Sequence, residues 1–201
     1  VINIENSLLK NEFNQKTILI TGAAGSIGSE IARQVASYNY KRLILIDQAE
    51  SPLYNLQHDF KLLKKTGQYF IVADIRSERR MTRIFNEYKP EIIFHAAAYK
   101  HVPLMEENAC EAVNVNIIGA QIVMDLAVKN EVEKFVMIST DKAVNPTNVM
   151  GATKRIAEMY SMCLKNTGKT KFITTRFGNV LGSNGSVIPL FKRQIDYGGP
   201  L

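Results

Sequence analysis

The chain has 201 residues, of which 46% are hydrophobic and 22% charged, and its formal net charge is +6. This length suffices for one well-buried domain, and the composition is ordinary for a globular protein. No apolar stretch reads as long enough to span a bilayer, and the N-terminus lacks a signal-peptide pattern. The basic residues are scattered without interleaved aromatic residues, so we expect small anionic ligands and no nucleic-acid partner.

Residues 1–15 are polar and mixed, and we expect a lead-in segment or a short surface helix there. From residue 16 onward, strand and helix patterns alternate. The strands are continuous apolar runs, which are typical of parallel strands buried on both faces. We therefore expect an α/β, doubly wound parallel sheet, Rossmann-like, over 16–180. The expected strands are 17–21, 42–46, 69–72, 91–95, 134–138 and 171–175, and the expected helices are 26–38, 51–65, 78–87, 105–129 and 150–166.

Within 105–129, apolar residues recur at helical spacing, and we interpret them as core contacts: Val113, Ile117, Ala120, Met124 and Ala127. Cys110 and Cys163 fall in expected helices and are interpreted as core or boundary thiols in a reducing compartment. After residue 176, glycines and prolines become frequent around one short apolar helix near 188–195. The pattern stops at Gly-Gly-Pro-Leu, so 181–201 is expected to be only the start of a C-terminal substrate-binding region.

A glycine-rich turn follows the first expected strand. Glycines at 22, 25 and 28 allow backbone amides to approach a pyrophosphate, and the next helix directs its positive end at the same anion. Asp47 ends the second strand, where dinucleotide folds place an acid on the ribose hydroxyls. Because no Arg follows Asp47, the pattern favours NAD over NADP. The cofactor-binding residues expected from this turn are Gly22, Ala24, Gly25, Ser26, Ile27 and Gly28.

Further polar clusters follow the other strands, at the edge where ligands of open parallel sheets bind. Asp74 and Ile75 follow the third strand, where an adenine would lie. Ala96, Ala97 and Ala98 follow the fourth strand, and their small side chains leave room for a ribose and a nicotinamide. We expect His95 to be structural, His58 to be exposed on a helix, and His101 either to face an anionic ligand or to have no role. No metal-ligand spacing and no Ser-His-Asp arrangement is present in the sequence.

The fifth strand is followed by Ser139-Thr140-Asp141-Lys142. An adjacent Asp and Lys can act as an acid–base pair when burial or a bound anion tunes their pKa values. The plainer interpretation is a loop ion pair. The position next to an expected nicotinamide favours the functional interpretation. Lys154 opens the next helix, and alone would be a surface lysine.

Together these clusters resemble the extended short-chain dehydrogenase/reductase superfamily, and more narrowly the UDP-N-acetylglucosamine 4,6-dehydratases of the CapD-like polysaccharide-biosynthesis group. The resemblance runs from Thr21 to the terminus and is carried most specifically by the segments 95–103, 139–148 and 177–183. The segment 139–148 is the most telling, because most superfamily members lack its Asp-Lys pair.

The resemblance implies that NAD takes a hydride from C4 of a UDP-N-acetylhexosamine and returns it to C6 after water has left, giving a 4-keto-6-deoxy sugar. Lys142 would be the C5 base and Asp141 the acid for the leaving water, while Thr140 would hold the sugar near C4. Lys154 would bind the nicotinamide ribose. The resemblance also implies substrate contacts for Asn179 and Lys100, and a contact of Val180 with the nicotinamide carboxamide.

Met150 departs from the superfamily pattern, which has a Tyr four residues before the helical Lys. A thioether cannot ionise, so the base for the C4 hydroxyl stays open between Asp141 acting through Thr140, a water near Lys154, and Tyr99. Relatives of this type continue beyond residue 201 and often carry an N-terminal membrane region. We therefore expect cytoplasmic localisation, or the cytoplasmic face of a membrane with the tether outside this chain. We also expect a homo-oligomer, and NAD binding with weak or no catalysis by these 201 residues alone.

Two other functions compete with dehydration. A UDP-sugar 4-epimerase would share the cofactor and the C4 oxidation, but it needs no Asp-Lys pair. A non-catalytic NAD sensor would explain the missing Tyr, but it gives no reason for Thr140, Asp141, Lys142 and Lys154 to occur together. A sensor should tolerate Asp141→Asn and Lys142→Ala, whereas a dehydratase should not.

Overall fold

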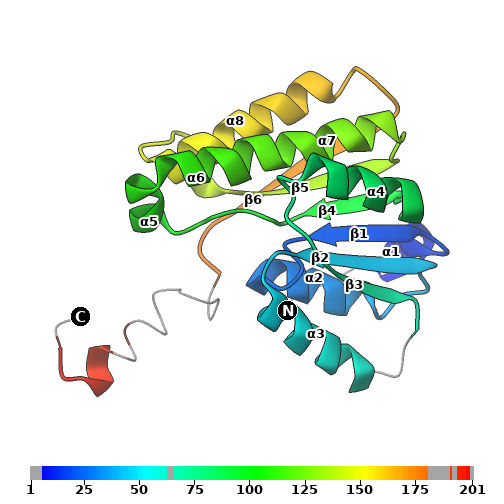
Figure 1. Cartoon of the computed structure of the whole chain (residues 1–201), viewed down its shortest axis with the longest axis horizontal. Helices are drawn as coiled ribbons and strands as arrows, with labels where there is room; N and C mark the ends of the chain where they lie inside the picture. The colour runs from blue at the N-terminus through cyan, green and yellow to red at the C-terminus, as the bar shows by residue number, and fades with distance from the viewer. Residues whose placement is uncertain (1–5, 63–65, 181–190, 192–193, 200–201) are drawn as a thin grey trace.

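The structure is a computed structural model that describes residues 6–62, 66–180, 191 and 194–199. Six parallel strands form one sheet in the order β3-β2-β1-β4-β5-β6 (Figure 1). This order and the helices on both faces confirm the expected doubly wound, Rossmann-like sheet. The strands are β1 (Thr17–Thr21), β2 (Arg42–Asp47), β3 (Gln68–Val72), β4 (Ile92–His95), β5 (Lys134–Thr140) and β6 (Lys171–Phe177).

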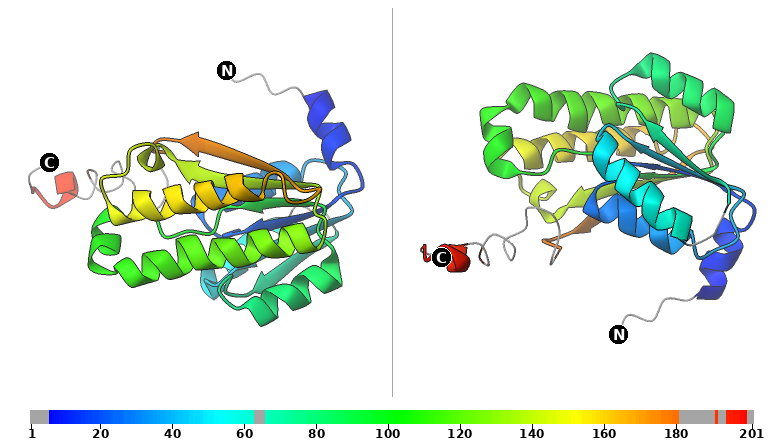
Figure 2. Two further views of the ribbon diagram at one scale, coloured as in Figure 1. Left: turned by 90° about the horizontal axis from the view of Figure 1, so that it is seen from above. Right: turned by 60° about the horizontal axis from the view of Figure 1, so that its bottom comes forward.

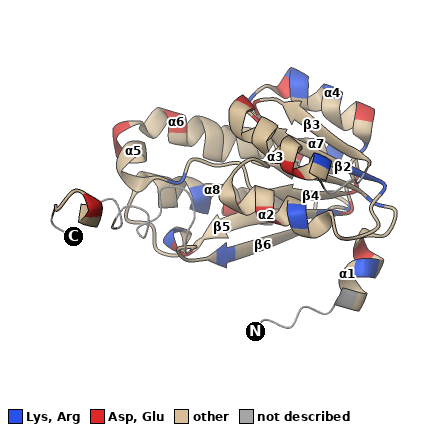
Figure 3. Ribbon diagram, turned by 90° about the horizontal axis from the view of Figure 1, so that it is seen from below, with Lys and Arg blue, Asp and Glu red and all other residues tan. Residues whose placement is uncertain are grey.

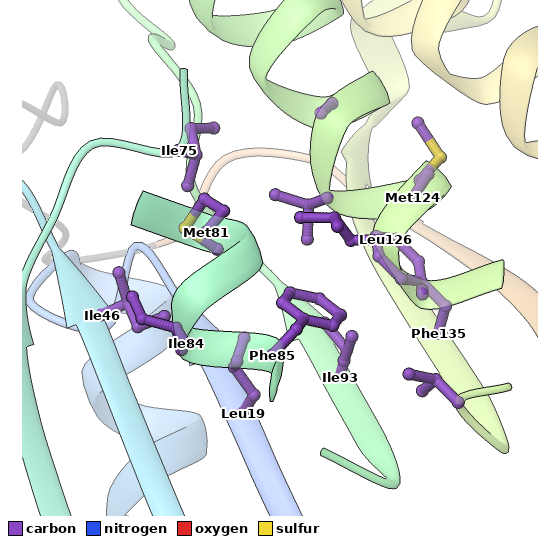
Figure 4. Close-up of a cluster of buried hydrophobic side chains, with 14 of the residues drawn as sticks. Leu19, Ile46, Ile75, Met81, Ile84, Phe85, Ile93, Met124, Leu126 and Phe135 are labelled. Atoms are coloured by element: carbon purple, nitrogen blue, oxygen red, sulfur yellow. The ribbon is translucent and has the colours of Figure 1, made fainter. Parts of the chain in front are cut away.

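Alternate strand residues pack into two cores on opposite faces of the sheet. Leu19 belongs to the core beneath α4 (Glu78–Tyr88), α7 (Ala120–Lys129) and α8 (Val149–Leu164), which Figure 4 shows. Ile18 and Ile20 belong to the core beneath α2 (Ser26–Val35) and α3 (Glu50–Leu62). The two helical layers are seen on either side of the sheet in Figure 2. Burial on both faces explains the continuous apolar sequences of β1, β2 and β4. The same expectation was wrong for β5, where only alternate residues are buried.

The expected lead-in segment contains the short helix α1 (Asn6–Phe13). Phe13 is buried, and its ring lies 5.3 Å from that of Tyr38 and 6.2 Å from that of Phe94. The helix is therefore attached to the body by an aromatic cluster. Figure 3 shows that α1 and α4 each carry both acidic and basic residues. The expected helix near 188–195 lies outside the described residues except at 191, 194 and 195, and the boundary at 181 stays a prediction.

The helix expected at 105–129 is interrupted. It consists of α5 (Val102–Glu107), α6 (Ala109–Val113), the π-helix η1 (Asn114–Gly119) and α7. The π turn contains an additional residue, so it rotates the buried face of the helix. The prediction that Val113 is a core residue was wrong, since its side chain is exposed, and Ile117 is only half-buried. The predicted core contacts Ala120, Met124 and Ala127 are buried, as expected.

The prediction that no stretch is long and apolar enough to span a bilayer was wrong for Ala109–Lys129. This segment has 21 residues, and an 18-residue window within it has a mean hydropathy of 1.3. Half of that window is buried inside the structure, as in the core helix of a globular protein. Cys110 and Cys163 are both exposed free thiols, so the interpretation of these residues as core or boundary thiols was wrong. Each lies on an outward face of its helix.

Candidate functional site

The glycine turn between β1 and α2 accepts no larger residue at two of its positions. Gly22 has a φ of +66°, and a Cβ there would lie 2.5 Å from the amide nitrogen of Ala97. A Cβ on Gly28 would lie 2.0 Å from the carbonyl oxygen of Gly22. Gly25 is the N-cap of α2 and contributes no capping side chain. The positive end of α2 is consequently presented to an anion placed over the turn.

Asp47 stands beside this turn at the end of β2. Its Oδ2 accepts a 2.9 Å hydrogen bond from the amide of Ala24, and its Oδ1 accepts one of the same length from Ala49. Asp74, after β3, accepts hydrogen bonds from the backbone and guanidinium of Arg76, and the guanidinium holds the pKa of Asp74 below its usual value. Both acids therefore have fixed orientations at one edge of the sheet.

Two adjoining cavities lie at the carboxyl edge of the sheet, on either side of the crossover between β1 and β4. They have volumes of about 280 and 520 Å³ and share Gly22, Gly25, Ala96, Ala98 and Tyr99. The smaller cavity brings together the predicted residues Gly22, Ala24, Gly25, Asp47, Asp74, Ile75, Ala96, Ala97 and Ala98. The larger brings together Gly22, Gly25, Ser26, Ile27, Gly28, Ala96, Ala98, Lys100, Thr140, Lys142, Met150, Lys154, Asn179 and Val180.

Asp141 is the one predicted site residue that lines neither cavity. It begins the 3-10 turn η2 (Asp141–Ala143) after β5, and 56% of its side chain is exposed. Its Oδ1 accepts hydrogen bonds from Thr140 Oγ1 at 2.9 Å and from Lys142 Nζ at 3.3 Å. These two donors lower the pKa of Asp141, so its carboxyl group is ionised here.

Lys142 connects this turn to the end of β6. Its Nζ donates a second hydrogen bond, of 3.1 Å, to Oδ1 of Asn179. Thr140, Asp141, Lys142 and Asn179 thus form one hydrogen-bonded row, of which three members line the larger cavity. The sequence predicted each of these residues, but it did not predict the contact between Lys142 and Asn179.

Lys154 lies on α8, one turn after Met150. The side chain is buried rather than at the surface, and its Nζ donates a 2.7 Å hydrogen bond to the carbonyl oxygen of Ile138. Burial lowers the pKa of Lys154 to about 8, although the charge of Glu158 opposes the shift. Met150 is buried against Met105 and Ala112, so it has an apolar environment.

The expectations for two histidines are confirmed. His95 is buried, its Nδ1 lies 2.8 Å from Thr21 Oγ1, and burial lowers the pKa of the imidazole to about 3. It is therefore neutral and structural. His58 is exposed on α3. His101 is exposed and lines the larger cavity, and whether it faces an anionic ligand stays a prediction.

Sequence reasoning missed two polar residues that hold the site together. Asn116, buried in η1, accepts a hydrogen bond from the Tyr99 amide and donates to the Tyr99 carbonyl oxygen and to Thr153 Oγ1. Glu158, buried on α8, accepts hydrogen bonds from Ser139 and Arg176. Glu158 lies four residues after Lys154, so helical spacing could have placed both on the same face of α8. Asn116 could not be placed in this way, because the π turn shifts the helical periodicity around it.

The strand order and the paired cavities at the crossover define a Rossmann-type α/β domain with its site at the carboxyl edge. The family described as polysaccharide biosynthesis protein matches residues 18–201. The chain belongs to this family.

Three relatives illustrate the range of similar proteins. CapD, a capsular polysaccharide biosynthesis protein of Staphylococcus aureus, is 51% identical over the whole chain, which spans 34% of that protein. A UDP-N-acetylglucosamine 4,6-dehydratase (inverting) of Campylobacter jejuni is 39% identical over 92% of the chain and 55% of that protein. A UDP-glucose 4-epimerase of Rickettsia prowazekii is 36% identical over 94% of the chain and 56% of that protein. The chain therefore spans about a third to a little over half of these relatives.

Solved structures agree with this placement. Pen from Bacillus thuringiensis superposes with a TM-score of 0.86 at 38% identity, over 92% of this chain and 58% of that one. A dTDP-glucose 4,6-dehydratase, DesIV of Streptomyces venezuelae with NAD bound, has a TM-score of 0.78 at 23% identity, over 92% of this chain and 63% of that one. The second likeness concerns the fold alone.

Proposed function

We propose that the protein retains NAD and catalyses the 4,6-dehydration of a UDP-N-acetylhexosamine, with UDP-N-acetylglucosamine as the expected substrate, for the synthesis of surface polysaccharide. The observation that carries this proposal is the hydrogen-bonded row of Thr140, Asp141, Lys142 and Asn179 at the larger cavity. The 39% identical dehydratase supports the reaction class, and CapD supports the biosynthetic setting. We place the reaction in the cytoplasm or at the cytoplasmic face of a membrane.

The chain's own residues fit NAD. The turn at Gly22 and Gly28 has no room for side chains and leaves the end of α2 open to a pyrophosphate. Asp47 faces the smaller cavity with a fixed carboxylate, which suits ribose hydroxyls and disfavours a 2′-phosphate. The protonated Lys154 would bind the second ribose. When bound, NAD supplies oxidation at C4 of the sugar and the reverse reduction at C6.

Asp141 and Lys142 need opposite protonation states to act as acid and base. In the resting site they form an ion pair across a 3.3 Å contact between Lys142 Nζ and Asp141 Oδ1, so Asp141 must gain a proton and Lys142 must lose one before the elimination. A sugar that covers the pair removes water from it, and desolvation favours the neutral form. Lys142 can then take the C5 proton, and Asp141 can protonate the departing C6 hydroxyl.

Thr140 is the group that we propose for the first proton transfer, at the C4 hydroxyl. Its hydroxyl donates to the Asp141 carboxylate at 2.9 Å, so it can accept the C4 proton while it passes its own proton to Asp141. Asp141 then holds the proton that the C6 hydroxyl needs, and Lys142 releases its ammonium proton to solvent before it takes the C5 proton. Tyr99 is the weaker alternative, because its hydroxyl oxygen accepts a 3.3 Å hydrogen bond from Gln48 on the side of the smaller cavity. Met150 serves only as an apolar wall.

Lys100, Asn179 and Val180 complete the larger cavity. Lys100 would bind the charged or polar part of the UDP-sugar, Asn179 would bind the sugar, and Val180 would contact the nicotinamide carboxamide. Each of these assignments follows from the residue's place in the cavity and from the family resemblance.

The test is to incubate the full-length protein with NAD and UDP-N-acetylglucosamine in deuterated water. We expect a 4-keto-6-deoxy product with deuterium at C5, detected by proton NMR and mass spectrometry. Unchanged substrate with NAD bound would contradict the proposal.

A UDP-sugar 4-epimerase is the second candidate, favoured by the 36% identical epimerase. The same incubation distinguishes the two reactions, because an epimerase product keeps its C6 hydroxyl and takes no deuterium at C5. A protein that binds NAD and converts no UDP-sugar would instead act as the non-catalytic sensor considered from the sequence.

A further inference from the structure

A buried acid lies beneath the proposed catalytic row. Only 2% of the Glu158 side chain is exposed, and both carboxylate oxygens are engaged. Oε1 accepts hydrogen bonds from Ser139 Oγ at 2.6 Å and from Arg176 Nε at 2.8 Å, while Oε2 accepts one from Arg176 Nη2 at 2.6 Å. The two contacts with Arg176 form a bidentate pair, which fixes orientation as well as distance.

The two partners of Glu158 stand at matching positions in neighbouring strands. Ser139 in β5 is the register partner of Arg176 in β6. Lys142 comes three residues after Ser139, and Asn179 comes three residues after Arg176. Glu158 therefore joins the two strands just before the segments that carry Lys142 and Asn179, and the Lys142–Asn179 hydrogen bond joins those segments again beyond the strand ends.

The end of β6 is held in part by the contacts of Glu158 with Ser139 and Arg176, which we call the Glu158 clamp. In the described sheet β6 is an edge strand that pairs with β5 alone, and its residues 174–177 are exposed. The hydrogen bonds of β5 hold one side of β6, and Arg176 joins that strand to α8, which packs on both strands (Figure 2). Without Glu158, the segment that leads to Asn179 would lose the contact between Arg176 and α8.

Glu158 is also one helical turn after Lys154 on α8, and its charge raises the pKa of Lys154. Burial opposes the ionisation of Glu158 itself, but hydrogen bonds from Arg176 and Ser139 outweigh it and lower its pKa. Lys154 and Arg176 are charged groups facing Glu158 from its own helix and from β6, and Arg155 adds a longer contact at 3.4 Å. The carboxyl group of Glu158 is thus held in its ionised form.

We propose that Glu158 is a positioning residue of the dehydration site: it ties α8 to the ends of β5 and β6 and thereby sets the separation of Lys142 and Asn179. This inference rests on the proposed function, because it gives the Lys142–Asn179 pair a role in binding and deprotonating the sugar. Glu158 itself touches neither cofactor nor substrate. Its removal should affect the sugar more than NAD.

The test compares Glu158→Gln and Glu158→Asp with Tyr160→Phe in the full-length protein. Tyr160 is a matched control on the same helix, since its hydroxyl bonds Asp125 of α7 and not the strand ends. We expect Glu158→Gln to weaken UDP-N-acetylglucosamine binding about tenfold by calorimetry and to lower kcat about 100-fold, with NAD affinity at pH 6.5 within twofold of wild type. Glu158→Asp, which keeps the charge, should recover part of kcat.

A pH profile adds a readout that loss of stability alone would not move. Because Glu158→Gln removes a charge that favours protonated Lys154, the pH at which NAD binding begins to weaken should move to a lower value, whereas Tyr160→Phe should leave it in place. If Glu158→Gln does not fold, Ser139→Ala provides the test by releasing β5 alone, and the same preferential loss of sugar binding is expected.

The outcomes separate the two proposals. Wild-type protein that forms no 4-keto-6-deoxy sugar overturns the proposed function. An active wild type, with Glu158→Gln or Ser139→Ala equal to Tyr160→Phe in sugar affinity, kcat and pH profile, overturns the role of Glu158 and leaves the function intact.

Discussion

Gly151 lies so close to the backbone of Lys142 that a Cβ on this glycine would come within 2.4 Å of the Lys142 carbonyl oxygen. The first turn of α8 therefore rests directly on the turn that carries the proposed acid and base. Asn148, the N-cap of α8, accepts a 2.8 Å hydrogen bond from the Gly151 amide and fixes the start of the helix. Two segments of the site thus meet at a contact between backbones.

Gly151→Ala should separate these segments. The clashing atom belongs to the backbone and cannot move away cheaply, so we expect a loss of about 1–3 kcal/mol in the free energy of unfolding and a kcat at least tenfold lower. Urea unfolding and product formation measure the two effects. Gly168→Ala is the control, because the added Cβ would meet only a methyl group of Val128, at 3.3 Å. Equal behaviour of the two variants would contradict the importance of the Gly151 contact.

Asp141→Asn and Lys142→Ala should each abolish dehydration while leaving NAD bound. Removing a positioned acid or base costs about 100- to 10,000-fold in rate, and neither residue touches the glycine turn. Single-turnover product formation and NAD titration measure the two properties. Lys169→Ala is the matched control, because Lys169 pairs with Glu131 on the surface, and both precede the amino ends of β6 and β5, at the edge of the sheet opposite the site. Dehydration at the wild-type rate in either site variant would favour an epimerase or a sensor.

Most of the fold could be predicted because buried parallel strands have a distinctive sequence. A run such as Ile18-Leu19-Ile20 is apolar at every position, since its two faces pack against different helical layers. The interruption of the helix at η1 could not be predicted, because it is associated with tertiary contacts that no local sequence pattern specifies. The π turn places Asn116 between the Tyr99 backbone and Thr153, and both partners lie far from it in the chain.

The candidate site could be predicted as far as it follows strand ends. Parallel strands all finish at one edge, so Asp47, Asp74, the alanines at 96–98 and Lys142 had to converge. The clamp formed by Glu158 and Arg176 depends on how α8 lies across β5 and β6, which no local pattern specifies. For the same reason the sequence did not show that Asp141 stands beside the larger cavity rather than in its wall.

Asp47→Asn should weaken NAD binding about tenfold or more. The change removes a charge that would accept hydrogen bonds from ribose hydroxyls, and hydrogen bonds to charged groups contribute about 1.5–3 kcal/mol each. It also leaves the amide of Ala24 or Ala49 facing an NH₂ group, which distorts the turn. Calorimetric titration with NAD gives the dissociation constant. Asp59→Asn is the control, since Asp59 pairs with Arg33 on the surface, and a loss as large as that of Asp47→Asn would argue against a role for Asp47.

Lys154 should make NAD binding depend on pH with a midpoint near 8. Burial lowers the pKa of Lys154 from 10.5 to about 8, so below pH 8 the folded protein presents an ammonium group to the ribose, and above it the amine is neutral. We expect the NAD dissociation constant to be flat from pH 6.5 to 7.5 and to rise by up to about tenfold per unit above pH 8. Lys154→Met should bind NAD weakly at all of these pH values.

The titration of Lys154 should also affect the stability of the protein without NAD, but here the contribution of Lys154 becomes more favourable as the pH rises. Between pH 8 and 10.5 the unfolded chain keeps the Lys154 proton that the folded chain has lost, so the unfolded state binds more protons and this residue's contribution to stability rises with pH. The difference in Tm between wild type and Lys154→Met should therefore move in favour of wild type from pH 7.5 to 9.5. A difference that stays constant over this range would mean that Lys154 is not desolvated in the folded protein, and the pH dependence expected for NAD would lose its physical basis.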